Sequence, residues 1–541
     1  MILKPASRGL SYLRTDYHAS MVLLMIMVGL VLLMACANLA NLLLAQAGAR
    51  SREVAVRLAL GASRGRLIRQ HLTESLLLAT GGAALGAIWA QWAGRLLVLW
   101  ISPSRGPVFL SLAPDFRMVA FTGGVTIITG LLFGVGPALR ATRLMPQAAL
   151  KEGGNGLTDS RQRLSFGRAL VTGQVAMSLL LLVGAGLFVR SLQGLLTQEM
   201  GFRRDHMLLV RPEWRWAPYT TERKFAASEQ FLEQLRSLPG VESASASAVT
   251  PIGGMAYMDD IEISSRQGYR KAHSFFNTVT PGFFATMGTK LLAGRDFTNH
   301  DTQHAPRVAL LNETAARRFF PGIDPIGQTY REPAFEKRPE IVAQFVGVVQ
   351  DAKYVNLRRD PPPTIYIPMA QNPEVFAWCE VRYAGPVADL ISRVEEGVRA
   401  TDPRIGLDFR LFSTQISESV LQERLVARLT SVFGVLALGL ASIGLYGLVA
   451  YAVTRRRSEI GVRMALGASP GAVVRLMLRE TAGLLGAGVS LGLLSAVVGG
   501  RFVRSMLFGL APTDPLTLGG ACLVLFGCSI HGRVGAGAAG G

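Results

Sequence analysis

Residues 53–65 read EVAVRLALGASRG, and residues 459–471 read EIGVRMALGASPG. Nine of the thirteen positions are identical, although the two segments lie 406 residues apart. Each segment follows one apolar stretch and precedes another, and the similarity extends to Glu74 and Glu480 in the stretches that follow. A block that recurs at so wide a spacing and in the same setting predicts two copies of one membrane unit.

The composition is typical of a membrane protein with a sizeable soluble part. Half of the 541 residues are hydrophobic, 17% are charged, and the mean hydropathy is +0.32. The net charge is +19, but the arginines gather beside the apolar stretches, as they do in cytoplasmic loops. No basic helix with interleaved aromatic residues is present, so we expect no nucleic-acid partner. The four cysteines offer no disulfide framework.

Apolar runs long enough to cross the hydrocarbon core predict about seven membrane spans. They cover residues 20–47, 72–101, 118–139, 170–189, 427–453, 482–503 and 516–530. The arginine-rich segments 48–71 and 454–479 belong in the cytoplasm, so the long segment 191–424 faces outside. We therefore expect a polytopic α-helical membrane protein with two repeated units and a large α+β extracytoplasmic domain.

The segment 191–424 alternates strand-like and helix-like stretches. A strand at 207–211, an amphipathic helix at 221–238 and a strand at 241–249 predict a βαβ unit. Further strands and helices are expected at 307–311, 313–319, 341–349, 364–367, 375–383 and 387–400. His300 and His304 are four residues apart and would bind a metal on a helix, but Pro306 and the polar surroundings favour a loop. We expect no metal site here.

The repeated segment itself predicts a short helix on the inner face of the membrane. Glu53 and Arg57, like Glu459 and Arg463, have the four-residue spacing of a favourable helical ion pair. Gly61 and Gly467 would end these helices, and Ser63 and Ser469 would cap the helices that follow. Such a helix either anchors a loop at the interface or is gripped by a soluble partner. Its recurrence in both units favours a partner.

These segments also carry a family resemblance. The E-[VI]-[AG]-V-R-[LM]-A-L-G-A-S repeats, NLANLLLA at 38–45 and PALRATRLMPQAAL at 137–150 resemble permease subunits of MacB/FtsX-type ATP-binding-cassette (ABC) transporters. The doubled arrangement resembles the duplicated orphan permeases of that family. The resemblance implies that coupling helices near 52–62 and 458–468 dock on a separate ATPase. It also implies that 191–424 is a MacB-like core domain.

The resemblance implies a multi-pass protein of the bacterial inner membrane, in contact with lipid and with an ABC ATPase subunit. ATP and magnesium would bind to that partner, and this chain would bind no cofactor. The implied function is export or extraction of a substrate, with a periplasmic adaptor or another cell-envelope protein as a further partner. The alternative is an FtsX-like device that regulates an external enzyme without moving cargo.

The motifs of a P-loop ATPase and of a zinc protease are missing from the sequence. No G-x-x-x-x-G-K-[ST] segment occurs, so the chain has no P-loop with which to hold the phosphates of ATP. No H-E-x-x-H segment of a zinc protease occurs either. We expect no catalytic residues and assign ATPase activity to another chain.

A few polar residues within the predicted spans are candidate interface residues. Asn38 and Asn41 lie on one helical face, where they would hydrogen-bond a neighbouring span or, less commonly, contact a substrate. Glu74 and Glu480 enter a span near its inner end and need a partner or interfacial water. We predict that Arg57 pairs with Glu74, and Arg463 with Glu480, so that each coupling helix and the next span form one lever.

The resulting domain division has seven parts. A remnant of an extracytoplasmic domain is expected at 1–19, and the chain resembles a duplicated permease shortened at both ends. The remaining parts are a first permease unit of three spans at 20–150, a cytoplasmic linker at 151–165, the first span of the second unit at 166–190, the core domain at 191–424, three further spans at 425–530 and an aberrant Gly/Ala tail at 531–541.

Overall fold

The computed structural model describes most of the chain and separates it into two compact units. The described residues are 12–49, 63–101, 115–128, 157–213, 219–253, 257–265, 268–334, 339–372, 378–455 and 470–538. The first unit, here called the helical unit, comprises residues 1–194 and 422–541, and the second, the extracytoplasmic domain, comprises 195–421. Each unit is described by itself.

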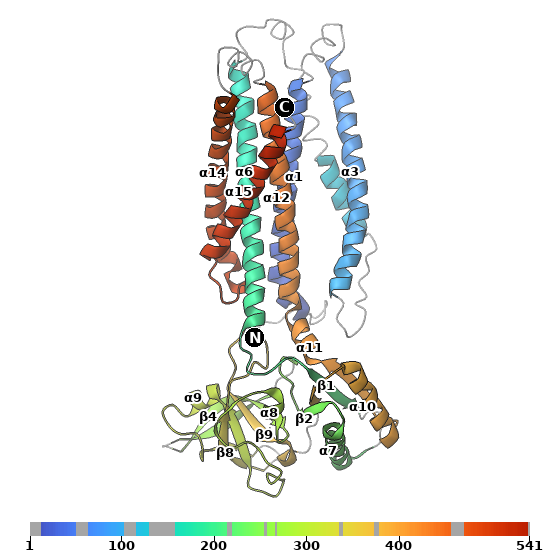
Figure 1. Cartoon of the computed structure of the whole chain (residues 1–541), viewed down its shortest axis with the longest axis vertical. Helices are drawn as coiled ribbons and strands as arrows, with labels where there is room; N and C mark the ends of the chain where they lie inside the picture. Colours follow the sequence, from blue (N-terminus) through green and yellow to red (C-terminus); the bar gives the residue numbers. More distant parts are fainter. Residues whose placement is uncertain are drawn as a thin grey trace. The chain divides into compact units, whose positions relative to one another are not determined.

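The helical unit consists of long apolar helices (Figure 1). They are α1 (Tyr12–Ala49), α3 (Arg64–Ile101), α6 (Leu157–Thr197), α12 (Leu421–Arg455), α14 (Pro470–Val503) with the one-turn η4 (Arg504–Met506), and α15 (Pro515–Ala538). Within the described residues, five stretches are long and apolar enough to cross a membrane: 18–41, 72–96, 167–197, 421–447 and 482–506. Shorter apolar helices at Phe116–Ile128 and Pro515–Cys528 lie where the third and seventh spans were predicted.

Several helices extend beyond the predicted spans. Helix α1 begins at Tyr12, inside the segment expected to be a domain remnant, and α6 begins at Leu157, inside the expected cytoplasmic linker. Helix α15 continues to Ala538, through most of the expected Gly/Ala tail. A helix continues past its apolar stretch as long as no Pro or capping residue stops it, and alanine favours it most. Hydropathy alone therefore underestimates helix length.

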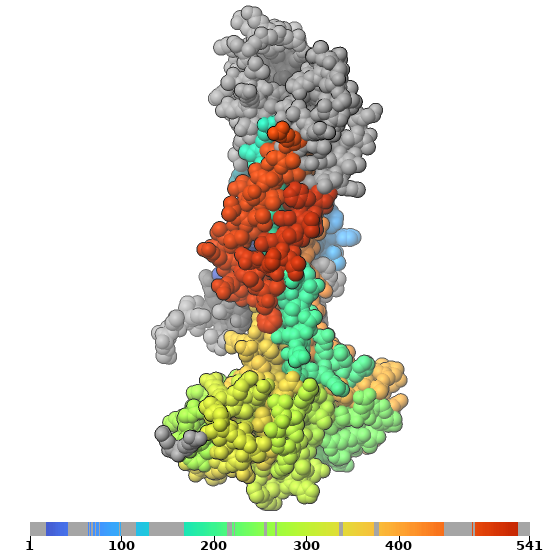
Figure 2. Space-filling view, turned by 60° about the vertical axis from the view of Figure 1, so that its left-hand side comes forward, coloured from blue at the N-terminus to red at the C-terminus, as the bar shows by residue number. Residues whose placement is uncertain are grey.

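Helix α6 forms the centre of the packing. Its residues Val171, Val175, Leu179, Val183 and Leu187 recur every four positions, are almost fully buried and make one continuous apolar face. This face packs against residues of α12, α14 and α15. In Figure 2 the carboxy-terminal helices (red) cover the middle of α6, and parts of α6 (teal) remain visible above and below them.

Glycines let α14 approach α6 closely. A Cβ at Gly488 would lie 2.6 Å from Val175 Cγ1, and a Cβ at Gly492 would lie 3.0 Å from Leu179 Cβ. These two glycines are four residues apart, the small-xxx-small spacing by which membrane helices pack without a hydrophobic driving force.

The extracytoplasmic domain contains two lobes. The first lobe is an antiparallel sheet with strand order β11-β1-β10-β2, formed by β1 (Met207–Glu213), β2 (Val241–Ser247), β10 (Trp378–Tyr383) and β11 (Gly406–Leu411). Helices α7 (Thr221–Ser237) and α10 (Val387–Thr401) pack on one face through Phe231, Leu235 and Val394. Strand β10 lies between β1 and β2, so the predicted βαβ unit is of the split kind.

The other face of this sheet carries a buried carboxyl group. Glu380 on β10 is fully buried and accepts hydrogen bonds from Ser247 Oγ at 2.5 Å and Ser245 Oγ at 3.2 Å, both on β2. Burial raises the pKa of Glu380 to about 8, although the two serine hydroxyls favour the ionised form. The carboxyl group is therefore largely protonated at neutral pH.

The second lobe is a small closed barrel. Its strands follow the order β4-β3-β7-β8-β6-β9, and β9 also pairs with β4, which closes the ring. They are β3 (Tyr257–Ser265), β4 (Gly268–Val279), β6 (Val308–Asn312), β7 (Thr329–Glu332), β8 (Ile341–Val349) and β9 (Thr364–Pro368). The edge strand β5 (Leu291–Gly294) pairs with β8, and α8 (Phe283–Met287), α9 (Glu313–Phe319) and η3 (Met369–Gln371) connect the strands.

Candidate functional site

Three helices of the helical unit meet at a cluster of amide groups, here called the amide node. Asn38 of α1 donates from Nδ2 to the carbonyl oxygen of Leu440 on α12 at 2.8 Å. Its Oδ1 accepts from Nε2 of Gln174 on α6 at 3.1 Å, and the same nitrogen lies 3.4 Å from the carbonyl oxygen of Met34. Gln174 is fully buried, so this hydrogen bonding takes place away from solvent.

The amide node depends on a glycine of α12, Gly444, which has no side chain. A Cβ at Gly444 of α12 would collide with Gln174 Oε1 and would lie 2.5 Å from Asn38 Oδ1. A methyl group here would have to displace the amides, so glycine lets the α12 backbone lie against both of them. Around the node, Met34, Leu181, Ala437 and other buried residues form an apolar cluster shared by α1, α6 and α12.

Some polar atoms at this interface have no hydrogen-bond partner within the described part of the chain. They are Asn41 Nδ2, Gln174 Oε1 and Ser178 Oγ. An unpaired buried polar group in apolar surroundings costs free energy. The interface thus keeps spare donors and acceptors that a different arrangement of the helices, or a bound polar group, would satisfy.

A second polar contact links α6 to the start of α15. Asp514 precedes α15 and caps it, because its carboxylate accepts from Thr517 N at 2.8 Å and Thr517 Oγ1 at 2.6 Å. The same carboxylate forms an ion pair with Arg190 of α6. The hydrogen bonds from Thr517, together with Arg190, hold the pKa of Asp514 below its ordinary value. This pair fixes the connection between α14 and α15 against α6.

Most of the predicted coupling residues lie outside the described residues. These are Glu53, Arg57, Gly61, Glu459, Arg463, Gly467 and Ser469. Ser63 is described: it is exposed, it directly precedes α3, and its carbonyl accepts from Arg66 N at 3.1 Å. Helices α3 and α14 begin at Arg64 and Pro470, which are equivalent positions of the repeat.

The two predicted lever residues are only partly observed. Glu74 lies on α3 and is exposed, whereas Glu480 lies on α14 at a position whose side chain is outside the described set. The predicted partners Arg57 and Arg463 also fall outside it, so the two pairs stay predictions. Asn38 does hydrogen-bond a neighbouring helix, and Asn41 lies one turn away on α1.

Sequence reasoning did not select Gln174, Arg190 or Asp514 for the site. An amide in an apolar span is a visible signal, but nothing in the sequence around Gln174 shows that it faces α1. Arg190 and Asp514 are 324 residues apart, and only the packing of α15 on α6 brings them together.

Comparison with protein families assigns both units. The MacB-like periplasmic core domain matches residues 169–402, and the FtsX-like permease C-terminal domain matches residues 25–146 and again 431–530. The chain belongs to the MacB/FtsX-type ABC transporter permeases. The core-domain match covers nearly all of the extracytoplasmic domain, and the two matches to the permease domain flank it.

Individual relatives of this permease are more distant. It is 37% identical over 117 residues to the macrolide export ATP-binding/permease protein MacB of Brucella abortus, a match covering 20% of this chain and 16% of that protein. It is 35% identical over 112 residues to the pyoverdine export ATP-binding/permease protein PvdT of Pseudomonas aeruginosa, covering 20% and 15%. With MacB of Rhodospirillum rubrum, identity is 25% over 289 residues, covering 49% and 43%.

The permease thus spans less than half the length of the curated relatives that it matches. Among solved structures, it is similar to the periplasmic region of MacB from Actinobacillus actinomycetemcomitans, with 14% sequence identity, a TM-score of 0.28, and coverage of 41% of this chain and 95% of that one.

Proposed function

We propose that this chain is the permease subunit through which a separate ATPase drives export or extraction of a substrate at the bacterial inner membrane. The observation that carries the proposal is the repeated segment. It recurs with the same Glu, Arg, Gly and Ser residues directly before two equivalent helices, α3 and α14. Two equivalent coupling helices would fit an ATPase dimer, because each subunit of a symmetric dimer offers the same binding surface.

In this proposal the repeated segments are the coupling helices. Glu53 and Glu459 contact the ATPase, Arg57 and Arg463 connect each coupling helix to Glu74 and Glu480, and the glycines and serines set the turn into the next helix. ATP and magnesium bind to the ATPase. Lipid surrounds the helical unit, and the extracytoplasmic domain is available to an adaptor or another cell-envelope protein.

The amide node gives the helical unit a place to rearrange. Asn38 and Gln174 connect α1, from the first match to the permease domain, with α6 and α12, which lead into and out of the extracytoplasmic domain. Because Asn41 and Ser178 hold spare polar atoms, a shift of α1 along this interface exchanges hydrogen bonds instead of losing them. Motion of α1 would thereby reach α6 and α12.

The proposal is tested by pull-down from the native host with the tagged chain. We expect the wild-type chain to retain a P-loop ATPase, quantified by mass spectrometry. The double reversal Glu53→Lys/Glu459→Lys should reduce the ATPase signal at least tenfold at an unchanged level of membrane insertion. Loss of a close charged contact of this kind costs about 2–5 kcal/mol. Reversal of the exposed Glu233 on α7 is the matched control, and retention of the ATPase by the double reversal would restore the loop-anchor interpretation.

Export and external regulation predict different results in the same strain. An exporter with an inactive ATPase should accumulate a compound or lipoprotein in the inner membrane or periplasm. A regulatory device should leave those levels unchanged and should instead alter the activity of a captured cell-wall enzyme. The proteins and small molecules retained on the extracytoplasmic domain, measured in parallel, decide between the two modes.

A further inference from the structure

The two lobes of the extracytoplasmic domain are joined by a turn with an unusual backbone. Residues 248–253 lead from β2 of the first lobe toward β3 of the barrel. Ile252 in this turn has φ 58°, a left-handed conformation that is unfavourable for a β-branched side chain. Such a residue persists only when its surroundings hold it in place.

The barrel lobe holds the turn from one side. Asn277 of β4 is almost fully buried, and its side-chain amide brackets Val249: Oδ1 accepts from Val249 N at 3.0 Å, and Nδ2 donates to Val249 O at 2.9 Å. Ile252 N donates to the carbonyl oxygen of Tyr354 at 2.8 Å. The backbone of the turn is therefore fixed to the barrel at two points.

The first lobe holds the same turn through one side chain, that of Gln415. This residue lies on α11 (Phe412–Ser419), which begins directly after β11, and it is 2% exposed. Its Nε2 donates to Thr250 Oγ1 at 3.0 Å and to the carbonyl oxygen of Pro251 at 2.8 Å. Its Oε1 accepts from Arg410 Nη1 at 2.9 Å.

A mostly buried ion pair orients Gln415. Arg410, at the end of β11, pairs with Glu418 one turn past Gln415 on α11, and their side chains are 11% and 18% exposed. Because Arg410 contacts both residues, rotation of α11 against β11 would break this pair and move Gln415 away from the turn. Only Val420 separates α11 from the long helix α12.

We infer that Gln415 is a positioning residue that helps to set the angle between the two lobes by holding the strained turn at Ile252. The direct backbone pairing of the lobes is sparse at this junction. Strand β2 pairs with β4 only at Ser247 and Val279, beside hydrogen bonds between Ala246 and Thr280 and between Ala248 and Thr278. A short hydrogen-bonded contact of this kind resists separation more than rotation. Arg382 of β10 also crosses between the lobes, because its guanidinium group donates to the carbonyl oxygen of Thr286 on α8 at 2.6 and 3.0 Å. Gln415 adds the bridge that acts on the strained turn itself.

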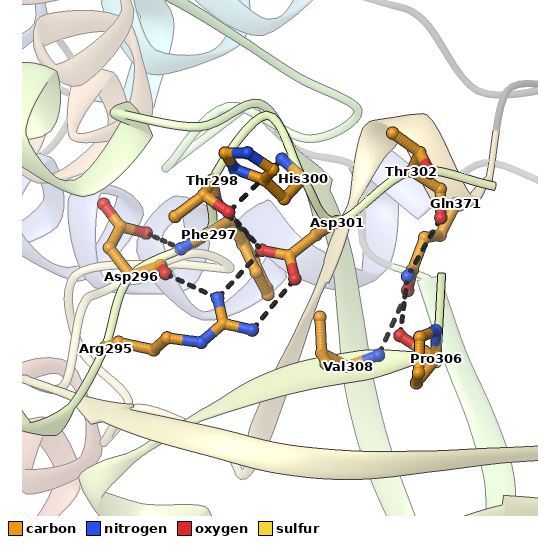
Figure 3. Close-up of polar contacts among 10 residues, drawn as sticks. All are labelled: Arg295, Asp296, Phe297, Thr298, His300, Asp301, Thr302, Pro306, Val308 and Gln371. Atoms are coloured by element: carbon orange, nitrogen blue, oxygen red, sulfur yellow. Dashed lines mark hydrogen bonds and ion pairs between the residues drawn. The ribbon is translucent and has the colours of Figure 1, made fainter. Parts of the chain in front are cut away.

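The domain supplies its own matched control in a second buried glutamine. Gln371 is 3% exposed and also makes three side-chain contacts, donating to the carbonyl oxygens of Thr302 and Pro306 and accepting from Val308 N. Figure 3 shows these contacts beside the loop that Arg295 and Asp301 close by an ion pair. All of its partners belong to the barrel lobe, so Gln371 stabilises a loop without bridging the lobes.

The test measures the distance between the lobes in the full-length chain. Spin labels are placed at the exposed positions Gln230 on α7 and Arg318 on α9. The four native cysteines are replaced by alanine. Distances between the labels are measured by pulsed electron paramagnetic resonance in lipid nanodiscs. Gln415→Leu should at least double the width of the distance distribution or shift its maximum. Gln371→Leu should lower the unfolding temperature while leaving the distribution unchanged.

Equal distributions for the wild type and Gln415→Leu would overturn the inference, as would equal broadening by Gln371→Leu. If Gln415→Leu does not fold, Thr250→Val carries the test. It removes one acceptor of Gln415 and keeps the Pro251 carbonyl, so a smaller broadening is expected. The experiment uses no ATPase, so its outcome is independent of the proposed transport function.

Discussion

Helices α14 and α3 occupy equivalent places in the two copies of the repeat, yet they pack differently. Gly488 and Gly492 of α14 lie against Val175 and Leu179 of α6. At the equivalent glycines of α3, Gly82 and Gly86, an added Cβ would have no described atom within 4 Å. The small-xxx-small spacing is present in both helices, but only α14 has a partner across it among the described residues.

The difference shows that a small-xxx-small motif allows a helix to pack closely but does not by itself show which helix, if any, packs against it. Helix α6 provides a face of buried Val and Leu residues to α14, and no counterpart of that face meets α3 within the described ranges. Large apolar side chains of α3 are accordingly exposed, Trp89 by 73% and Leu85 by 65%. In a membrane, these side chains face lipid or another protein.

The largest effect is expected where α14 touches α6. Gly492→Leu forces a side chain into Leu179 and the α6 backbone, and overpacking of this kind costs about 3 kcal/mol. Gly86→Leu on α3 meets open space and should change stability by less than about 0.5 kcal/mol. Thermal unfolding of both variants in the same detergent measures the difference. Equal destabilisation would mean that α3 is as closely packed as α14.

A smaller effect is expected at the amide node, where an internal comparison on α12 is available. Gly444→Ala places a methyl group against Gln174 and Asn38, and we expect a loss of about 1–2 kcal/mol. Gly447→Ala, one turn away with open space at its Cβ position, should be neutral or slightly stabilising because alanine favours helices. A neutral Gly444→Ala would show that the node adjusts freely and does not hold α12.

The smallest effect concerns the residues that precede the last helix of each copy. Asp514→Ala removes the cap of α15 and the ion pair with Arg190, at a cost of about 1 kcal/mol. Asp115→Ala is the comparison, before the helix Phe116–Ile128. The contacts described for Asp115 are two hydrogen bonds that its main-chain carbonyl oxygen accepts from Met118 N and Val119 N, and alanine keeps both. Differential scanning fluorimetry should give a lower unfolding temperature for Asp514→Ala than for Asp115→Ala. The reverse order would show that the contact of Asp514 with α6 does not stabilise the helical unit.

Periodicity and hydropathy predicted much of the architecture. The strands at 341–349 and the helix at 313–319 have the predicted bounds, because each is a regular pattern ended by turn residues. The hairpin of β3 and β4 and strands β5, β7 and β11 were not predicted. Strands β3, β4 and β7 mix charged and apolar residues on a barrel surface where the outward face is polar, which weakens the alternation. Strand β5 has only the four residues LLAG, too few for a recognisable alternation.

The site was less accessible to sequence reasoning. Asn38 was selected because an amide in a span needs a neighbouring helix, and it does hydrogen-bond α12 at the carbonyl oxygen of Leu440. The involvement of Gln174, and the bridge from Gln415 to Thr250, depend on contacts between residues more than 130 positions apart. A local pattern cannot encode such a contact, because either partner alone is an ordinary polar residue.

Glu380 makes the first lobe a proton-binding element. In the unfolded chain its carboxyl group would titrate near the ordinary value of 4.5, whereas in the folded lobe burial raises the pKa to about 8. Between these values the folded state holds a proton that the unfolded state has released, so the free energy of unfolding falls as the pH rises. The contribution is complete below about pH 4.5 and is lost by about pH 8. The sheet beneath the lobe junction is therefore held most firmly in an acidified exterior, and an alkaline exterior places a charge between its two serines.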